Sequence, residues 1–143
     1  MKNRYLSFPE MLETISGSKE SVVESLQKFK HNKPFLEFLR LAYDPNILFD
    51  VDVPEYKRDE HIPVDFAYSS MASEMRRMYI FLPEYQKISG KRKGEILCQM
   101  LESFDTSEAT LLGKLINKKI EVPELSKELL EEVFPELFKQ THV

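Results

Sequence analysis

The sequence predicts an all-α protein, an irregular bundle of about seven short helices with one long ordered loop near residues 44–64. Three observations predict this class. The chain has only four glycines in 143 residues, which suits helices better than a turn-rich β-sandwich. Apolar residues recur at helical spacing along most of the chain. The composition, 42% hydrophobic and 31% charged, is typical of a folded globular protein.

Capping signals divide the first 43 residues into three short helices. Ser7-x-x-Glu10 is a capping box, which predicts a helix over about residues 8–15. Ser18 and Asn32 are residue types that favour N-caps, and each precedes apolar residues at helical spacing. We therefore expect a second helix after Ser18 and a third after Asn32.

The middle of the chain lacks a helical period at first and then regains one. Residues 44–63 contain three prolines among acidic and apolar residues, which predicts an ordered loop laid over the helices. Asp65 then opens a long helix to about Leu82, and Pro83 closes it. Its expected buried stripe is Phe66, Met71, Met75, Met78 and Tyr79.

Three further helices are predicted in the last third of the chain. One runs from about Lys93 to Ser103, after a basic turn that contains Gly90. Asp105-x-x-Glu108 is a box-like cap that starts the next helix. A final acidic helix begins at about Ser126, and the fold ends in an apolar segment that contains Phe134, Leu137 and Phe138.

Length and cysteine usage indicate a single domain over residues 1–143 in a reducing compartment. A chain of this size builds one hydrophobic core. Cys98 is the only cysteine, so no internal disulfide forms. No apolar run approaches the roughly 20 residues that cross a bilayer, and no signal-type stretch is present. We expect a cytoplasmic protein without a membrane partner.

The residues that enzymes need are not grouped in this sequence. The histidines, His31, His61 and His142, share no helical face and show no metal-binding spacing. One cysteine cannot build a zinc knuckle or ribbon. We therefore expect a protein that is not an enzyme, with no catalytic residue, metal, cofactor or small-molecule substrate.

Positive charge is concentrated in one part of an acidic chain. The net charge is −4, yet residues 76–119 carry nine basic and five acidic residues, so the rest of the chain is at −8. A glycine-bearing turn before a helix offers free N–H groups and the positive end of the helix dipole to a phosphate. The candidate nucleic-acid-binding residues are Arg76, Arg77, Lys87, Ser89, Gly90, Lys91, Arg92, Lys93, Lys114, Lys118 and Lys119.

The order of short motifs resembles the N-terminal helical DNA-binding domain of the ATP-dependent DNA ligase of T-even phages. The motifs are Ser16-Gly17-Ser18-Lys19, Lys30-His31-Asn32-Lys33-Pro34-Phe35-Leu36, Leu41-Ala42-Tyr43-Asp44-Pro45, Ile88-Ser89-Gly90-Lys91, Leu112-Gly113-Lys114-Leu115-Ile116-Asn117-Lys118-Lys119 and Val133-Phe134-Pro135-Glu136-Leu137. They span roughly residues 16 to 138. The resemblance implies that two turns, 89–91 and 114–119, touch a DNA backbone across the minor groove. The nucleotidyl-transfer motif KxDG is absent, so the resemblance does not imply ligation.

A more compact stretch is similar to a family of small uncharacterised proteins of tailed phages, best represented in marine myophages. The residues that carry this similarity are Lys91-Arg92-Lys93-Gly94-Glu95-Ile96-Leu97-Cys98-Gln99-Met100-Leu101-Glu102, Glu108-Ala109-x-Leu111-Leu112 and Lys118-Lys119. The resemblance implies a protein that acts in the host bacterial cytoplasm, and it implies no activity.

Three functions remain open at this point. The first is a non-catalytic phage accessory protein that binds double-stranded DNA weakly, without sequence specificity, through a basic face. The second is a protein–protein adaptor or inhibitor that uses its acidic surfaces on phage or host replication, transcription or defence proteins. Its expected partner-binding residues are Phe134, Leu137 and Phe138. The third is a small virion or assembly component.

Overall fold

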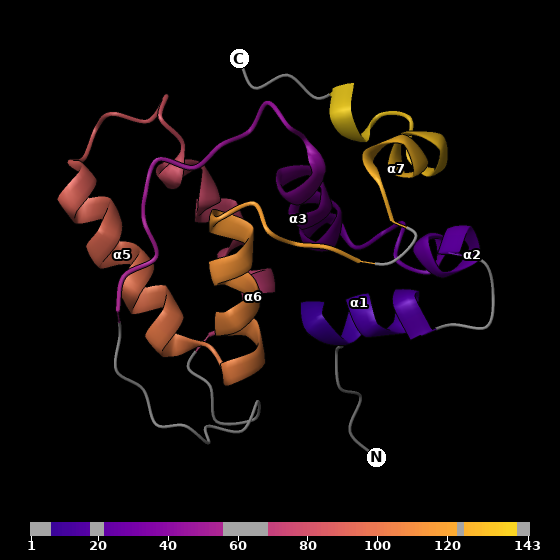
Figure 1. The fold of residues 1–143 in the computed structure, drawn as a ribbon, viewed down its shortest axis with the longest axis horizontal. Coiled ribbons are helices and arrows are strands. Elements are labelled where there is room, and N and C mark those ends of the chain that lie inside the picture. The colour runs from indigo at the N-terminus through magenta and orange to yellow at the C-terminus, as the bar shows by residue number, and fades with distance from the viewer. Residues whose placement is uncertain (1–6, 18–21, 56–68, 123–124, 140–143) are drawn as a thin grey trace.

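The computed structural model describes residues 7–17, 22–55, 69–122 and 125–139, and the regular structure within these ranges is entirely helical. Seven α-helices and two 3-10 helices follow one another (Figure 1): α1 (Phe8–Gly17), α2 (Val22–Gln27), α3 (Lys33–Tyr43), α4 (Met71–Glu74), η2 (Met75–Phe81), α5 (Gly90–Ser103), α6 (Thr106–Ile116), α7 (Lys127–Val133) and η3 (Leu137–Lys139). The predicted all-α class and number of helices are confirmed.

Local side-chain caps explain where most of these helices begin. The Ser7 hydroxyl accepts from the Glu10 N–H at 3.4 Å, and the Glu10 carboxylate accepts from the Ser7 N–H at 2.8 Å, which completes the predicted capping box. Four other helices start after a residue whose side chain accepts the N–H three positions on: Asn32, Ser89, Asp105 and Ser126. Each cap pairs a backbone donor that the helix itself leaves free.

The long helix expected from Asp65 to Leu82 is wrong. Residues 65–68 lie outside the described ranges, and Ser70 is extended and caps a helix that starts only at Met71. This helix tightens to 3-10 winding after Glu74. Side chains three positions apart line up in a 3-10 helix, so Met75, Met78 and Phe81 are all buried. Tyr79, which an α-helix would bring beneath Met75, is instead 54% exposed.

The loop after α3 is described as far as residue 55 and has no regular structure there. Every second side chain from Ile47 to Val53 packs partly buried against the core, and the residues between them are exposed. The Asp50 N–H donates to the carbonyl oxygen of Phe81 at 2.6 Å, which ties the loop to the end of η2. The remainder of the predicted loop, with its third proline, lies outside the described residues.

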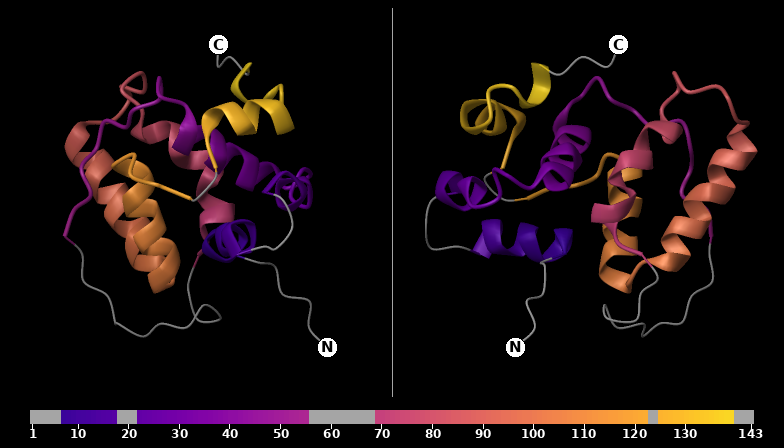
Figure 2. Two further views of the ribbon diagram at one scale, coloured as in Figure 1. Left: turned by 45° about the vertical axis from the view of Figure 1, so that its right-hand side comes forward. Right: turned by 180° about the vertical axis from the view of Figure 1, so that it is seen from behind.

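The buried side chains form one cluster from Phe8 to Leu137. Phe8 of α1 packs against α3 within this cluster, because the centre of its ring lies 5.4 Å from that of Phe35 and 5.2 Å from that of Phe38. Helices α5 and α6 form an antiparallel hairpin, and α6 lies between α5 and α1 (Figures 1 and 2). Helix α3 lies between α7 on one side and η2 on the other (Figure 2). Within the described ranges, no helix has the length and apolar character needed to cross a bilayer.

Candidate nucleic-acid interface

The N-terminus of α5 is the most open part of the predicted interface. The helix starts at Gly90, three residues earlier than predicted, because the Ser89 hydroxyl accepts the Arg92 N–H at 3.0 Å. Lys87, Ser89, Gly90 and Lys91 are all exposed. A side-chain carbon at Gly90 would meet nothing within 4 Å among the described residues, so this position is open at its side.

Two lysines at this end are free and the neighbouring arginine is paired. The described residues offer no partner to the side chains of Lys87 and Lys91. Arg92 forms an ion pair with Glu95 at 3.1 Å, and both side chains are about half exposed. An exposed pair of this kind exchanges readily with solvent, so Arg92 remains accessible to an anion.

Lys93 lies on the opposite, buried side of the same helix. Because α5 begins at Gly90, Lys93 falls one turn before Ile96 and Leu97 on the apolar face, and it is 2% exposed. Its Nζ donates to the carbonyl oxygen of Leu82 at 2.9 Å and lies 3.6 Å from a carboxylate oxygen of Asp50. Lys93 is therefore not available to a nucleic acid, and it fastens α5 to the loop after α3.

Arg76 and Arg77, two of the three predicted arginines of the interface, line different cavities. Arg76 is exposed and lines a cavity against α3, together with Lys33 and Pro34. Arg77 lines a different cavity against α5 and forms a 2.7 Å ion pair with Glu74. Adjacent positions on a helix point to different sides, so the pair cannot act on one ligand face.

The second predicted turn closes α6. Lys118 has a left-handed backbone with φ of 55°, and the hydrogen bonds of Lys118 N–H to Leu115 O and of Lys119 N–H to Lys114 O make a Schellman cap. The Lys118 Nζ turns inward and donates to the carbonyl oxygens of Leu41 and Asp44, where α3 ends. Burial lowers the pKa of Lys118, and the Asp44 carboxylate partly opposes this.

Lys114 and Lys119 are exposed on the α1 side of α6. Both line a cavity of about 370 Å³ whose other wall includes Leu12, Glu13 and Ser16 of α1. The end of α6 and the start of α5 lie at the same end of the hairpin (Figure 1). These two lysines thus face the cavity beside α1, which Lys87 and Lys91 do not line.

The expected partner-binding residues have three different environments. Leu137 is 5% exposed and belongs to the core. Phe138 is half-buried, and the Lys127 Nζ lies 5.6 Å from the centre of its ring. Phe134 lines a cavity of about 700 Å³ between α3 and the end of α7. Leu137 lines the same cavity but is almost fully buried, so Phe134 is the more accessible of the two.

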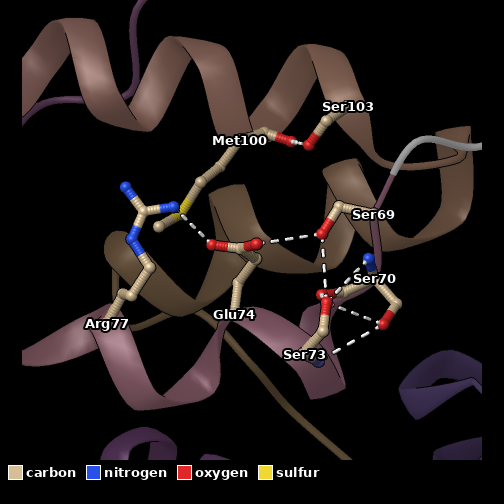
Figure 3. Close-up of polar contacts among 7 residues, drawn as sticks. All are labelled: Ser69, Ser70, Ser73, Glu74, Arg77, Met100 and Ser103. Carbon is tan, nitrogen blue, oxygen red and sulfur yellow. Dashed lines mark hydrogen bonds and ion pairs between the residues drawn. The ribbon is translucent and has the colours of Figure 1, made fainter.

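A group of polar side chains surrounds the start of α4, next to the end of α5 (Figure 3). The Ser69 hydroxyl donates to Glu74 at 3.0 Å, and the Ser69 N–H donates to the carbonyl oxygen of Ser103 at 3.1 Å. Ser70 and Ser73 cap α4 reciprocally. The hydroxyls therefore cap α4, and the backbone bond from Ser69 to Ser103 links this segment to α5, which is a structural use.

Glu108 is a buried carboxyl that the sequence assigned only to a cap. It is 2% exposed, and its carboxylate accepts hydrogen bonds from the N–H groups of Met71 and Phe8, at the starts of α4 and α1. The pKa of Glu108 is raised to about 7, mainly by burial and also by repulsion from Asp105 and Glu10, while the N–H groups of Met71 and Phe8 oppose the rise. The spacing Asp105-x-x-Glu108 predicted the cap correctly, but which N–H groups Glu108 binds depends on how distant helices pack.

Cys98 is the one cysteine of the chain, and its thiol lies on α5. Burial, followed by repulsion from Glu102, raises the pKa of the Cys98 thiol, which disfavours the reactive thiolate. Among the described residues, no three His, Cys, Asp or Glu side chains are placed to hold a metal ion.

Comparisons of the chain with protein-family models, with curated proteins and with solved structures found no match.

Proposed function

We propose that this chain is a non-catalytic phage accessory protein that binds the backbone of duplex DNA through the N-terminal end of α5. The observation that carries the proposal is a pair of exposed lysines, Lys87 and Lys91, which have no partner among the described residues and lie beside an open helix N-terminus. The resemblance of residues 88–91 to a turn of a DNA-ligase domain supports the same location. The host bacterial cytoplasm is where such a protein would meet its DNA.

The start of α5 suits a phosphate in two ways. The N–H groups of Gly90 and Lys91 have no acceptor within their own helix, whereas those of Arg92 and Lys93 are bound by Ser89. The helix dipole adds partial positive charge at the same point. Lys87, Lys91 and Arg92 then supply full charges that a phosphodiester neutralises.

This small site predicts weak binding that does not depend on base sequence, because contacts to phosphates position a protein without reading bases. Each neutralised phosphate contributes about −0.9 to the slope of log affinity against log salt. Two or three contacts therefore give a slope of roughly −2 to −3.

A pair of matched charge reversals tests the location. The double substitution Lys87→Glu/Lys91→Glu removes the two free cations of the site, and Lys33→Glu/Arg76→Glu makes the same change in net charge on the far side of η2. Both variants change exposed side chains, so circular dichroism should show unchanged helix content. The first variant should lose binding to a labelled duplex in fluorescence anisotropy, and the second should retain most of it. Equal losses would show that net charge alone matters, and equal retention would remove α5 as the site.

A further inference from the structure

Three cavities adjoin one another across the outer side of α3 and form one groove. Their volumes are about 700, 500 and 380 Å³. Glu37 lines all three, Lys33 lines the first two, and Tyr79 lines the last two. The groove runs from the α7 side of α3 to the η2 side, and these two elements flank α3 in Figure 2.

Each end of this α3 groove combines apolar side chains with charged ones. At the α7 end, Leu36, Val133 and Phe134 line the cavity of about 700 Å³, and the exposed side chains of Lys30 and His31 lie at its edge. At the η2 end, Tyr79 and Tyr85 stand edge to face with their ring centres 5.3 Å apart, over Met78. Tyr79 is one of the few large hydrophobic side chains left exposed among the described residues, which marks this end as a surface for contact.

The centre of the groove carries uncompensated positive charge. Lys33 and Arg76 are exposed there, and the part of the chain that the structure describes provides neither side chain with a partner. The one carboxylate at the centre, Glu37, is already held by the buried Arg40 through hydrogen bonds of 2.7 and 2.6 Å. The Glu37–Arg40 pair is neutral as a unit, so the field in the middle comes from Lys33 and Arg76.

Exposed carboxylates stand at the two ends of the groove, Glu136 beside Phe134 and Glu84 beside Tyr85. They would repel a polymer that carries a phosphate at every position. An apolar floor likewise gives little to a nucleic-acid backbone. The charge pattern therefore favours a protein segment with negative charge only at its centre.

We propose that the α3 groove docks an extended or helical segment of a partner protein in which a carboxylate lies between two apolar side chains. The central Asp or Glu pairs with Lys33 and Arg76. One apolar side chain enters the cavity at Phe134, and the other packs against Tyr79 and Tyr85. Grooves that bind peptides commonly recognise them by apolar side chains that enter pockets and by a few placed polar or charged groups. The cavities of the groove share no lining residue with Lys87, Lys91 or Arg92, so the proposal does not depend on DNA binding.

Selection from a randomised displayed peptide library tests the proposed chemistry directly. Wild-type protein serves as bait, after the library has been depleted on Lys33→Glu/Arg76→Glu. The expected consensus is Asp or Glu flanked on both sides by Leu, Ile, Phe or Met. A basic consensus, or no enrichment over the depleting variant, would overturn the proposal.

Titration of one selected peptide by fluorescence anisotropy then tests the residues. Lys33→Glu/Arg76→Glu should weaken binding at least about tenfold, and replacement of the central acid of the peptide by Lys should restore part of the affinity for this variant. Lys87→Glu/Lys91→Glu should bind the peptide as wild type does. Displacement of the peptide by duplex DNA, with DNA binding lost in Lys33→Glu/Arg76→Glu and kept in Lys87→Glu/Lys91→Glu, would assign the groove to nucleic acid instead. A wild-type dimer that the Lys33→Glu/Arg76→Glu substitution dissociates in sedimentation analysis would assign it to a second copy of the chain.

Discussion

Replacement of Glu108 by Gln should make the protein more stable at alkaline pH and remove most of a pH dependence that the wild type has. Glutamine keeps the shape of the side chain and can still accept the Met71 N–H, which lies 3.3 Å from the carboxylate. It removes the charge that burial disfavours. The substitution thus isolates the cost of an ionised carboxylate at a site that is 2% exposed.

The pKa of Glu108 sets the direction and the size of the effect. Burial, with repulsion from Asp105 and Glu10, raises this pKa from 4.5 to about 7 in the folded state. The folded protein therefore holds a proton between these pH values that the unfolded chain releases, so the free energy of unfolding falls as pH rises through the window. The full difference corresponds to roughly 3 kcal/mol.

Urea unfolding of both proteins at pH 8 and pH 5.5 measures this difference. We expect Glu108→Gln to be more stable than wild type by roughly 3 kcal/mol at pH 8 and by about 1 kcal/mol at pH 5.5. All other titrating groups are common to both proteins and cancel in the comparison. Glu102→Gln, an exposed carboxyl on α5, is the matched control and should track the wild type at both pH values. The reasoning fails if Glu108→Gln also tracks the wild type.

Two lysines give further predictions. Lys118→Met should lower the free energy of unfolding by about 1–3 kcal/mol, because two carbonyl oxygens at the end of α3 lose their donor. In the same urea assay, Lys118→Gly should lower the free energy of unfolding by about 1 kcal/mol less than Lys118→Met does, because glycine adopts the left-handed backbone without strain. A larger loss for Lys118→Gly than for Lys118→Met would contradict the account of this cap. Lys93→Glu should destabilise the fold by roughly 3–5 kcal/mol, because a buried carboxylate would face Asp50 and the carbonyl oxygen of Leu82. A wild-type melting temperature for this variant would show that Lys93 is not buried as described.

Signals that act within a few residues were read correctly from the sequence. The caps at Ser7, Asn32 and Asp105 each depend on a hydrogen bond to an N–H three positions away, so the chain itself specifies them. The all-α class followed from the same local signals and from the spacing of apolar residues.

Features that depend on packing between distant segments were not predicted. The change from α to 3-10 winding after Glu74 is set by how η2 packs against α3 and the core, and it alone turns Tyr79 outward. Lys93 had a usable signal, since it lies three and four positions before Ile96 and Leu97. Because α5 was predicted to start at Lys93, this residue was assigned to the basic turn and grouped with cations that face solvent.

The predicted basic face is thus divided by the fold. Counted along the sequence, residues 76–119 hold nine cations, but Lys93 and Lys118 turn inward and Arg76 and Arg77 lie on different sides of η2. Charge counted over a window says nothing about which way each side chain points. The DNA-binding proposal rests on the few cations that remain at the start of α5.

The ratio of duplex affinities between Lys33→Glu/Arg76→Glu and Lys87→Glu/Lys91→Glu, measured by anisotropy in low salt, tests this central claim most directly. The two variants carry the same net charge and differ only in where the cations were reversed. The account predicts that Lys33→Glu/Arg76→Glu binds at least about tenfold more tightly, in line with the loss of two phosphate contacts in the other variant. A ratio near one would contradict it, because the N-terminus of α5 would then have no special part in binding DNA.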